Sequence, residues 1–168
     1  NVRTIRLEQF PNSIWVEIET DENLTGLGEA WRGTAAIETI IHHDICPWLI
    51  GQDSRNIELI SRTLLTPYVG FHSASAEVRA ASAIDIALWD LAGKRHGIPV
   101  YEALGGASRS SIQVYNTCSG YSFNASSSAY NSGSSRRMIT DKDEMRGPYD
   151  DQVAFNRDAG ALAKSLLS

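Results

Sequence analysis

The chain has 168 residues, 42% of them hydrophobic and 21% charged, so it can bury one ordinary core but not two large ones. Fifteen Lys and Arg against twenty Asp and Glu give a net charge of -5, which excludes the basic surface that nucleic acid or an anionic membrane would require. Neither a membrane-spanning apolar run nor a signal peptide is visible, so we expect a soluble, cytoplasmic protein. The two cysteines, Cys46 and Cys118, lack zinc-site or disulfide spacing and are expected to be free thiols.

The first thirty residues predict a three-stranded antiparallel meander. The first strand begins at Val2, and a turn at Pro11 and Asn12 leads to the second. In the second strand, every other residue is apolar: Ile14, Val16 and Ile18. A turn at residues 21–23 precedes a third strand over residues 24–31. Gly26 and Gly28 would weaken that strand unless a backbone or a ligand approaches closely there.

Helical periodicity begins at Thr34 and predicts three helices. The first stops at Pro47, and the second is capped by Asp53 and Ser54 and ends at Pro67. The third, over residues 75–96, is apolar on most of its faces and should be packed on several sides. It should end at Gly97 in a left-handed cap.

The remaining residues predict a strand over 111–115, a serine-rich loop over 119–135 and a final helix over 148–168. The strand has no partner nearby in the sequence, and the final helix has no cap. We therefore expect that the polypeptide is the beginning of a larger fold.

Several motifs favour ordinary structural roles. The segment from Gly26 to Glu29 lies within a strand and lacks the helix of a dinucleotide-binding loop. His42 and His43 are adjacent on a helix and diverge, so with Asp44 they do not predict a metal site. The acidic residues 141–151 lack the spacing of a calcium loop.

Two carboxylates stand in the apolar helix over residues 75–96. Asp85 and Asp90 are five residues apart and therefore lie on different faces, so they do not form an acid/base pair. Each should be hydrogen-bonded by neighbouring N–H groups or paired with an Arg or Lys, because an unpaired buried charge is costly.

Three segments resemble a known family. They are AIDIALWDLAGK at 83–94, PVYEALGG at 99–106 and TDENLTGLGEAW at 20–31. Together they resemble the mandelate racemase and muconate lactonising group of the enolase superfamily. The resemblance implies an α+β capping domain at residues 1–106, a three-stranded meander with helices. Residues 107–168 would then be the first strand, long loop and first helix of an incomplete (β/α)8 barrel. Ala103 departs from the pattern, because a leucine is usual there, and if buried it would leave a cavity.

The resemblance also implies a chemistry. Family members use Mg²⁺ and a basic residue to remove the proton α to a substrate carboxylate, and an acid-sugar dehydratase is the activity we expect. The base and the metal carboxylates of the family stand on later barrel strands, so no catalytic or metal-binding residue is expected in this chain, which should be inactive alone. A racemase or cycloisomerase of the same group is an alternative, as is a non-catalytic capping module that docks on a partner. The complete enzyme should bind a small sugar acid and form a homo-oligomer.

The cap side of the substrate pocket should come from two loops, at residues 9–13 and 68–73. Phe71 and His72 in the second loop are predicted to face the substrate. Asn116, Thr117 and Cys118 follow the first barrel strand, where active-site groups of barrels collect, and Asn116 and Cys118 are predicted to contact substrate as well.

Overall fold

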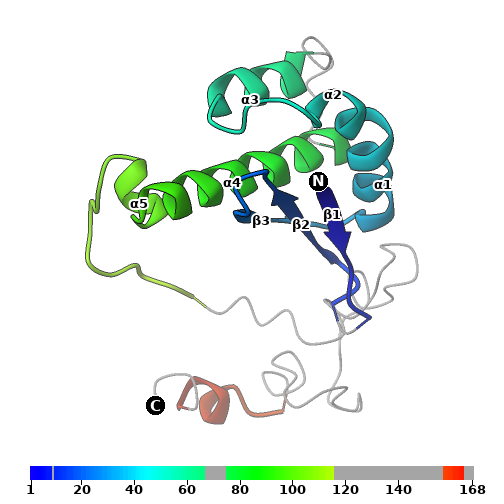
Figure 1. Cartoon of the computed structure of the whole chain (residues 1–168). Coiled ribbons are helices and arrows are strands. Elements are labelled where there is room, and N and C mark those ends of the chain that lie inside the picture. The colour runs from blue at the N-terminus through cyan, green and yellow to red at the C-terminus, as the bar shows by residue number, and fades with distance from the viewer. Residues whose placement is uncertain (9, 67–74, 116–156, 165–168) are drawn as a thin grey trace. The chain divides into compact units, whose positions relative to one another are not determined.

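The computed structural model describes residues 1–8, 10–66, 75–115 and 157–164. The chain forms two compact units, one of residues 1–8 and 13–110 and the other of residues 9–12 and 111–168. The first unit holds a three-stranded sheet followed by helices, as Figure 1 shows. It has the architecture predicted for the capping domain.

The sheet is an antiparallel meander in the order β1-β2-β3. Its strands are β1 (Val2–Ile5), β2 (Ser13–Glu19) and β3 (Thr25–Trp31). Val16 in the central strand lies opposite Thr4 on one side and Gly28 on the other. The predicted alternation is confirmed, because the apolar side chains of β2 point into the core while their neighbours are half-buried or exposed. The predicted turn between β2 and β3 is also present, with Asn23 at a φ of 59°.

The first helical segment runs further than predicted. It consists of α1 (Thr34–Thr39), the π-helix η1 (Ile40–Ile45) and α2 (Cys46–Leu49). The prediction that it stops at Pro47 is wrong. Pro47 stands in the first turn of α2, where a missing N–H is tolerated, and the N–H of Cys46 donates to the Ile41 carbonyl in the wider π pattern.

The helix α3 (Ile57–Leu65) buries Ile60 and Leu64, as its period predicts. The predicted cap at Asp53 and Ser54 is wrong, because these residues form a turn that precedes the helix. The Asp53 carboxylate accepts from the N–H of Arg55 at 3.0 Å, and the Asp53 carbonyl accepts from the N–H of Asn56 at 3.0 Å. Because the Asp53 side chain hydrogen-bonds within this turn, the first helical residue of α3 is Ile57.

The long helix α4 (Ala76–His96) begins and ends as predicted. Gly97 has a φ of 67°, and the N–H of Ile98 donates to the Gly93 carbonyl at 3.0 Å, which is the pattern of a Schellman cap. The short α5 (Val100–Ala103) follows Pro99. Ala103 is only half-buried, so the full cost of a buried cavity does not apply there.

The sheet packs on α4 at very close range, and the two strand glycines make this possible. A Cβ added at Gly26 would lie 2.1 Å from the Ala87 carbonyl oxygen, and one at Gly28 would lie 1.9 Å from that of Ala83. The close backbone approach foreseen for these glycines is confirmed. The largest fully buried side chains of the core come from the sheet and the helices together: Ile14, Val16, Ile37, Ile41, Ile60, Ile84, Leu88 and Leu91.

The expected start of a barrel is not seen in the described residues. Residues 111–115 form no strand, and Ile112 and Val114 are 72% and 80% exposed. The strand prediction there is wrong, because apolar alternation makes a strand only where a neighbouring strand accepts its hydrogen bonds. Residues 157–164 are helical, within the range predicted for the final helix, and the rest of that range lies outside the described residues. In the described part of the chain, no helix has the length and apolar character needed to cross a bilayer.

Candidate functional site

One end of the first unit gathers the segments that lead into both predicted substrate loops. β1 ends there and β2 begins there, since Ser13 pairs with Trp31 at the end of β3. The first turns of α1 and α4 lie at the same end (Figure 1). The guanidinium of Arg79, in the first turn of α4, donates to the Arg32 carbonyl at 3.2 Å and ties that helix to the end of β3. We call this end, defined by Trp31, Arg32 and Arg79, the loop end.

Arg32 is the most unusual residue of the loop end. Its φ of 63° lies in the left-handed region, and Gly33 follows with a φ of 74°. This reversal joins β3 to α1, which begins at Thr34. The Arg32 guanidinium lies over the Trp31 indole, 4.6 Å from the ring centroid, in a cation–π contact that holds the side chain in place.

The sequence-predicted site residues lie outside the described residues. This holds for Phe71 and His72 before α4, and for Asn116, Thr117 and Cys118 after residue 115. Their roles therefore stay predictions. Arg32 was not singled out from the sequence, although a cation next to an aromatic residue and before a glycine, between a strand and a helix, is a readable signal.

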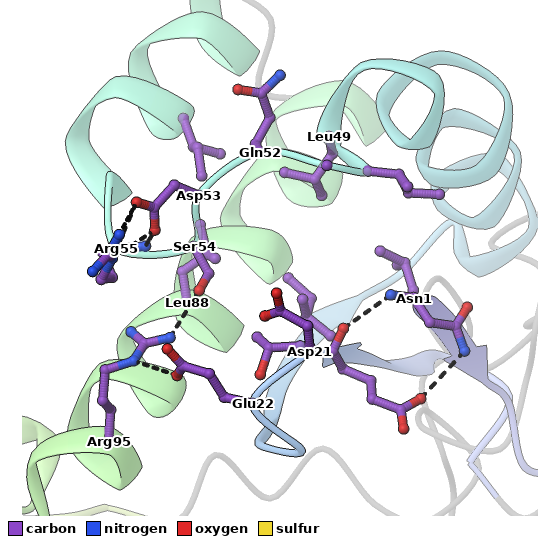
Figure 2. Close-up of a pocket in the computed structure, with 17 residues that line it drawn as sticks. Asn1, Asp21, Glu22, Leu49, Gln52, Asp53, Ser54, Arg55, Leu88 and Arg95 are labelled. Carbon is purple, nitrogen blue, oxygen red and sulfur yellow. Dashed lines mark hydrogen bonds and ion pairs between the residues drawn. The ribbon is translucent and has the colours of Figure 1, made fainter.

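A pocket of about 490 Å³ lies at the opposite end of the sheet, beside the β2–β3 turn (Figure 2). Its apolar lining comes from the sheet and from three helices: Val2, Ile18, Leu49, Ile60 and Leu88. The Arg95 guanidinium donates to the Glu22 carboxylate at 2.9 Å and to the Ser54 hydroxyl at 2.9 Å. These charged groups of the rim neutralise one another, and sequence reasoning did not foresee the pocket.

Asp53 on the pocket rim is tightly bound by Arg55. The Arg55 guanidinium donates to both carboxylate oxygens, with an Nη2–Oδ2 distance of 2.6 Å. These side-chain hydrogen bonds, with the bond from the Arg55 backbone N–H, lower the pKa of Asp53 to about 2. Asp53 is therefore ionised at neutral pH, and both of its carboxylate oxygens already accept hydrogen bonds from Arg55.

Of the two carboxylates of α4, Asp90 is bound as predicted, by an N–H group and a lysine, whereas Asp85 is bound by a hydroxyl instead of the predicted N–H groups or basic side chain. Asp85 accepts a hydrogen bond from the Ser61 hydroxyl on α3. Asp90 accepts from the N–H of Leu27 at 2.8 Å and from the Lys94 ammonium at 2.7 Å. Both residues therefore join elements of the fold, which is the structural role expected for them.

A magnesium site would need several convergent oxygen ligands. Among the described residues, no three His, Cys, Asp or Glu side chains are grouped so that they could hold a metal. His42 and His43 diverge, because His42 Nε2 lies 2.8 Å from the Thr4 hydroxyl while His43 Nδ1 lies 3.4 Å from Asp44. The described part of the chain therefore does not fit a Mg²⁺ ion.

The meander, the long helix closed by a left-handed glycine and the loop end together define an α+β capping domain. Residues 6–105 match the family model for the N-terminal domain of mandelate racemase and muconate lactonizing enzyme. The chain belongs to this family, and its predicted resemblance to the enolase superfamily is confirmed.

Two curated relatives carry the name of a sugar-acid dehydratase. A D-mannonate dehydratase of Rhizorhabdus wittichii is 37% identical over 113 residues, which are 65% of this chain and 27% of the relative. A D-galactonate dehydratase of Ralstonia nicotianae is 38% identical over 112 residues, 66% of this chain and 29% of the relative. The chain thus spans less than a third of the curated relatives it matches.

Solved structures agree on the fold. An enolase protein from environmental sequencing of the Sargasso Sea is 59% identical, with a TM-score of 0.66 over 71% of this chain and 32% of that chain. A proposed galactarate dehydratase from Agrobacterium radiobacter, with bound Na and L-malate, is 31% identical, with a TM-score of 0.62 over 68% and 29%. A racemase from Streptomyces coelicolor with bound magnesium is 32% identical, with a TM-score of 0.57 over 64% and 34%.

Proposed function

We propose that this chain is the capping part of a Mg²⁺-dependent sugar-acid dehydratase. The observation that carries the proposal is the family match over residues 6–105, together with relatives named for the dehydration of D-mannonate and D-galactonate. Magnesium is bound in one solved relative, a racemase. A racemase or cycloisomerase of the same family is the alternative within this class.

The division of labour follows from the residues that are present. Residues 1–106 would be the cap, and residues 107–168 would lead into the barrel. The metal would stabilise the charge that develops when the proton α to the substrate carboxylate is removed. The residues of the cap have a different role, because the loop end would position two loops that enclose the substrate and exclude water from it. Phe71, His72, Asn116 and Cys118 remain the proposed substrate contacts in this arrangement, in a cytoplasmic homo-oligomer.

The test compares two proteins on one panel of sugar acids that includes D-mannonate, D-galactonate and galactarate. The protein that continues this chain through a complete barrel should form a 2-keto-3-deoxy acid in the presence of Mg²⁺, and EDTA should abolish this activity. The purified 168-residue chain should form none. Turnover by the short chain well above background, or turnover that EDTA does not touch, would contradict the proposal.

A second candidate, a non-catalytic capping module, is favoured by apolar side chains exposed after α4. Tyr101 is 53% exposed and Leu104 is 63% exposed, both in the segment that follows the helix cap. Such a module should show a mass that rises with concentration in light scattering. A compact monomer at all concentrations would count against it.

A further inference from the structure

The pocket beside the β2–β3 turn has the size and the lining of a small-molecule site. Its volume of about 490 Å³ falls within the range of roughly 300–1,000 Å³ that is usual for such sites. Its floor consists of buried core side chains, all of them apolar: Val2, Ile18, Leu49, Ile60 and Leu88. Ile50 adds apolar surface at the rim, where it is 62% exposed. The pocket can therefore hold a hydrocarbon group away from water.

Hydrogen bonds within the chain hold both walls of the pocket. One wall is the segment between α2 and α3, where the Gln52 side chain donates to the Trp48 carbonyl at 3.2 Å. The other wall is the β2–β3 turn. The Arg95 guanidinium joins the two walls, because it donates to Glu22 of the turn and to Ser54 of the segment. A pocket that is formed before its ligand arrives loses less conformational entropy on binding.

The rim of the pocket is acidic. Four carboxylates line the pocket together with two guanidiniums: Glu19, Asp21, Glu22 and Asp53 with Arg55 and Arg95. The two guanidiniums already bind two of these carboxylates, Glu22 and Asp53. The hydrogen bond to Asp53 raises the pKa of Arg55, and the charges of Glu22 and Asp21 add to this effect. The rim therefore favours a cation over an anion.

Asp21 is the rim carboxylate that can bind such a cation. It is exposed and lies between Glu22 and Asn1 (Figure 2). In the described part of the chain, its carboxylate oxygens accept no hydrogen bond. The ammonium of Asn1 donates instead to the Glu19 carbonyl at 2.9 Å. A ligand can therefore donate to Asp21 without displacing an existing partner.

We propose that this pocket binds a small primary amine that carries an apolar group. The apolar group lies against the floor, and the ammonium, which has three N–H donors and no acceptor, donates to Asp21. The rim repels an anionic ligand of the same shape. This inference goes beyond the proposed function and does not depend on it.

Straight-chain amines and their uncharged or anionic counterparts test the proposal in the 168-residue chain. Hexylamine, which is protonated at neutral pH, should shift the amide NMR signals of residues 18–22 and 49–55, which line the pocket. It should bind about tenfold more tightly than butylamine, because two more methylene groups are buried. It should bind about three- to fivefold more tightly than 1-hexanol, as expected for an ion pair at an exposed carboxylate. Hexanoate should not bind.

Two variants separate the charge from the apolar contact. Asp21→Asn should lower the affinity for hexylamine to that for 1-hexanol and leave the affinity for 1-hexanol unchanged. Ile50→Ala removes apolar surface from the rim and should weaken the binding of both ligands alike. Asp44→Asn is the matched control, because Asp44 is an exposed aspartate on η1 that does not line the pocket. It should change neither affinity.

The proposal is overturned if hexylamine and 1-hexanol bind wild type equally, if hexanoate binds as well as hexylamine, or if hexylamine does not bind. Amide shifts away from the pocket would overturn it as well. An equal effect of Asp44→Asn and Asp21→Asn would show that the amine responds to the net charge of the chain, which also contradicts the assigned site. None of these outcomes bears on the dehydratase proposal, because the titration involves no turnover.

Discussion

At the scale of single residues, the glycines of β3 bring that strand very close to α4. The Cβ that an alanine would add at Gly28 would lie 1.9 Å from the Ala83 carbonyl oxygen, and that atom is backbone and cannot turn aside. We expect Gly28→Ala to lower the free energy of unfolding by about 3 kcal/mol, the upper part of the range for overpacked cores. Urea denaturation followed by tryptophan fluorescence measures this loss.

Gly33→Ala adds the same methyl group where nothing lies within 4 Å, at a φ of 74°. It should cost only the backbone strain of a left-handed residue, about 1 kcal/mol. If Gly28→Ala were no more destabilising than Gly33→Ala, the close approach of strand and helix would be contradicted.

Some single residues can be predicted from the sequence because an energetic rule constrains them. Asp85 and Asp90 had to find partners within an apolar helix, and Ser61, Leu27 and Lys94 supply them. Arg32 follows no such rule. Its conformation depends on the direction in which α1 leaves the sheet, and hydrophobic periodicity carries no information about that direction.

At the scale of elements, side chains from the helices bind both edges of the sheet. On the β3 edge, Asp90 accepts from the N–H of Leu27, and the Lys94 ammonium donates to the Thr25 carbonyl at 2.7 Å. On the β1 edge, the Thr4 hydroxyl donates to Glu38 of α1 at 2.9 Å. Polar groups placed along edge strands oppose pairing with another chain.

The β3 edge gives a second stability prediction. Asp90→Ala leaves the N–H of Leu27 without its acceptor and Lys94 without its carboxylate, so it should lower the free energy of unfolding by about 1–3 kcal/mol. Glu58→Ala is the control, because Glu58 and Arg62 form an ion pair of the same spacing on the exposed face of α3. It should cost no more than about 0.5 kcal/mol. Equal losses in chemical denaturation would show that the bond to β3 contributes nothing.

Hydrophobic periodicity predicted the strands and the long helix, which pack into the core. It failed at Asp53 and at residues 111–115, where local hydrogen bonds or the absence of a partner strand determine the structure. The bounds of the three strands and of α4 agree with the predicted ones to within a residue or two, because strand alternation and helical periodicity both mark the side chains that form one continuous core. Asp53 was read as a helix cap, but it closes a turn with Arg55. Residues 111–115 alternate like a strand, yet alternation does not supply the partner that a strand requires.

At the scale of the whole molecule, the core cluster of the described residues belongs to one segment of the chain. All members of the described core cluster fall between Val2 and Leu91, and the final cap at Gly97 closes the last helix that contributes to it. The four tryptophans, Trp15, Trp31, Trp48 and Trp89, lie within the same segment. Tryptophan fluorescence therefore reports on this unit alone.

This placement predicts that a chain ending at Ser110 folds by itself. Because the core cluster takes no member from the described residues 111–115 and 157–164, removing residues 111–168 should leave one cooperative transition in fluorescence and circular dichroism. A loss of 1 kcal/mol shifts the melting temperature of a domain this size by roughly 4–8 °C, so we expect the shortened chain to melt within about 4 °C of the full chain. A larger fall, or the loss of cooperativity, would mean that residues 111–168 stabilise the cap.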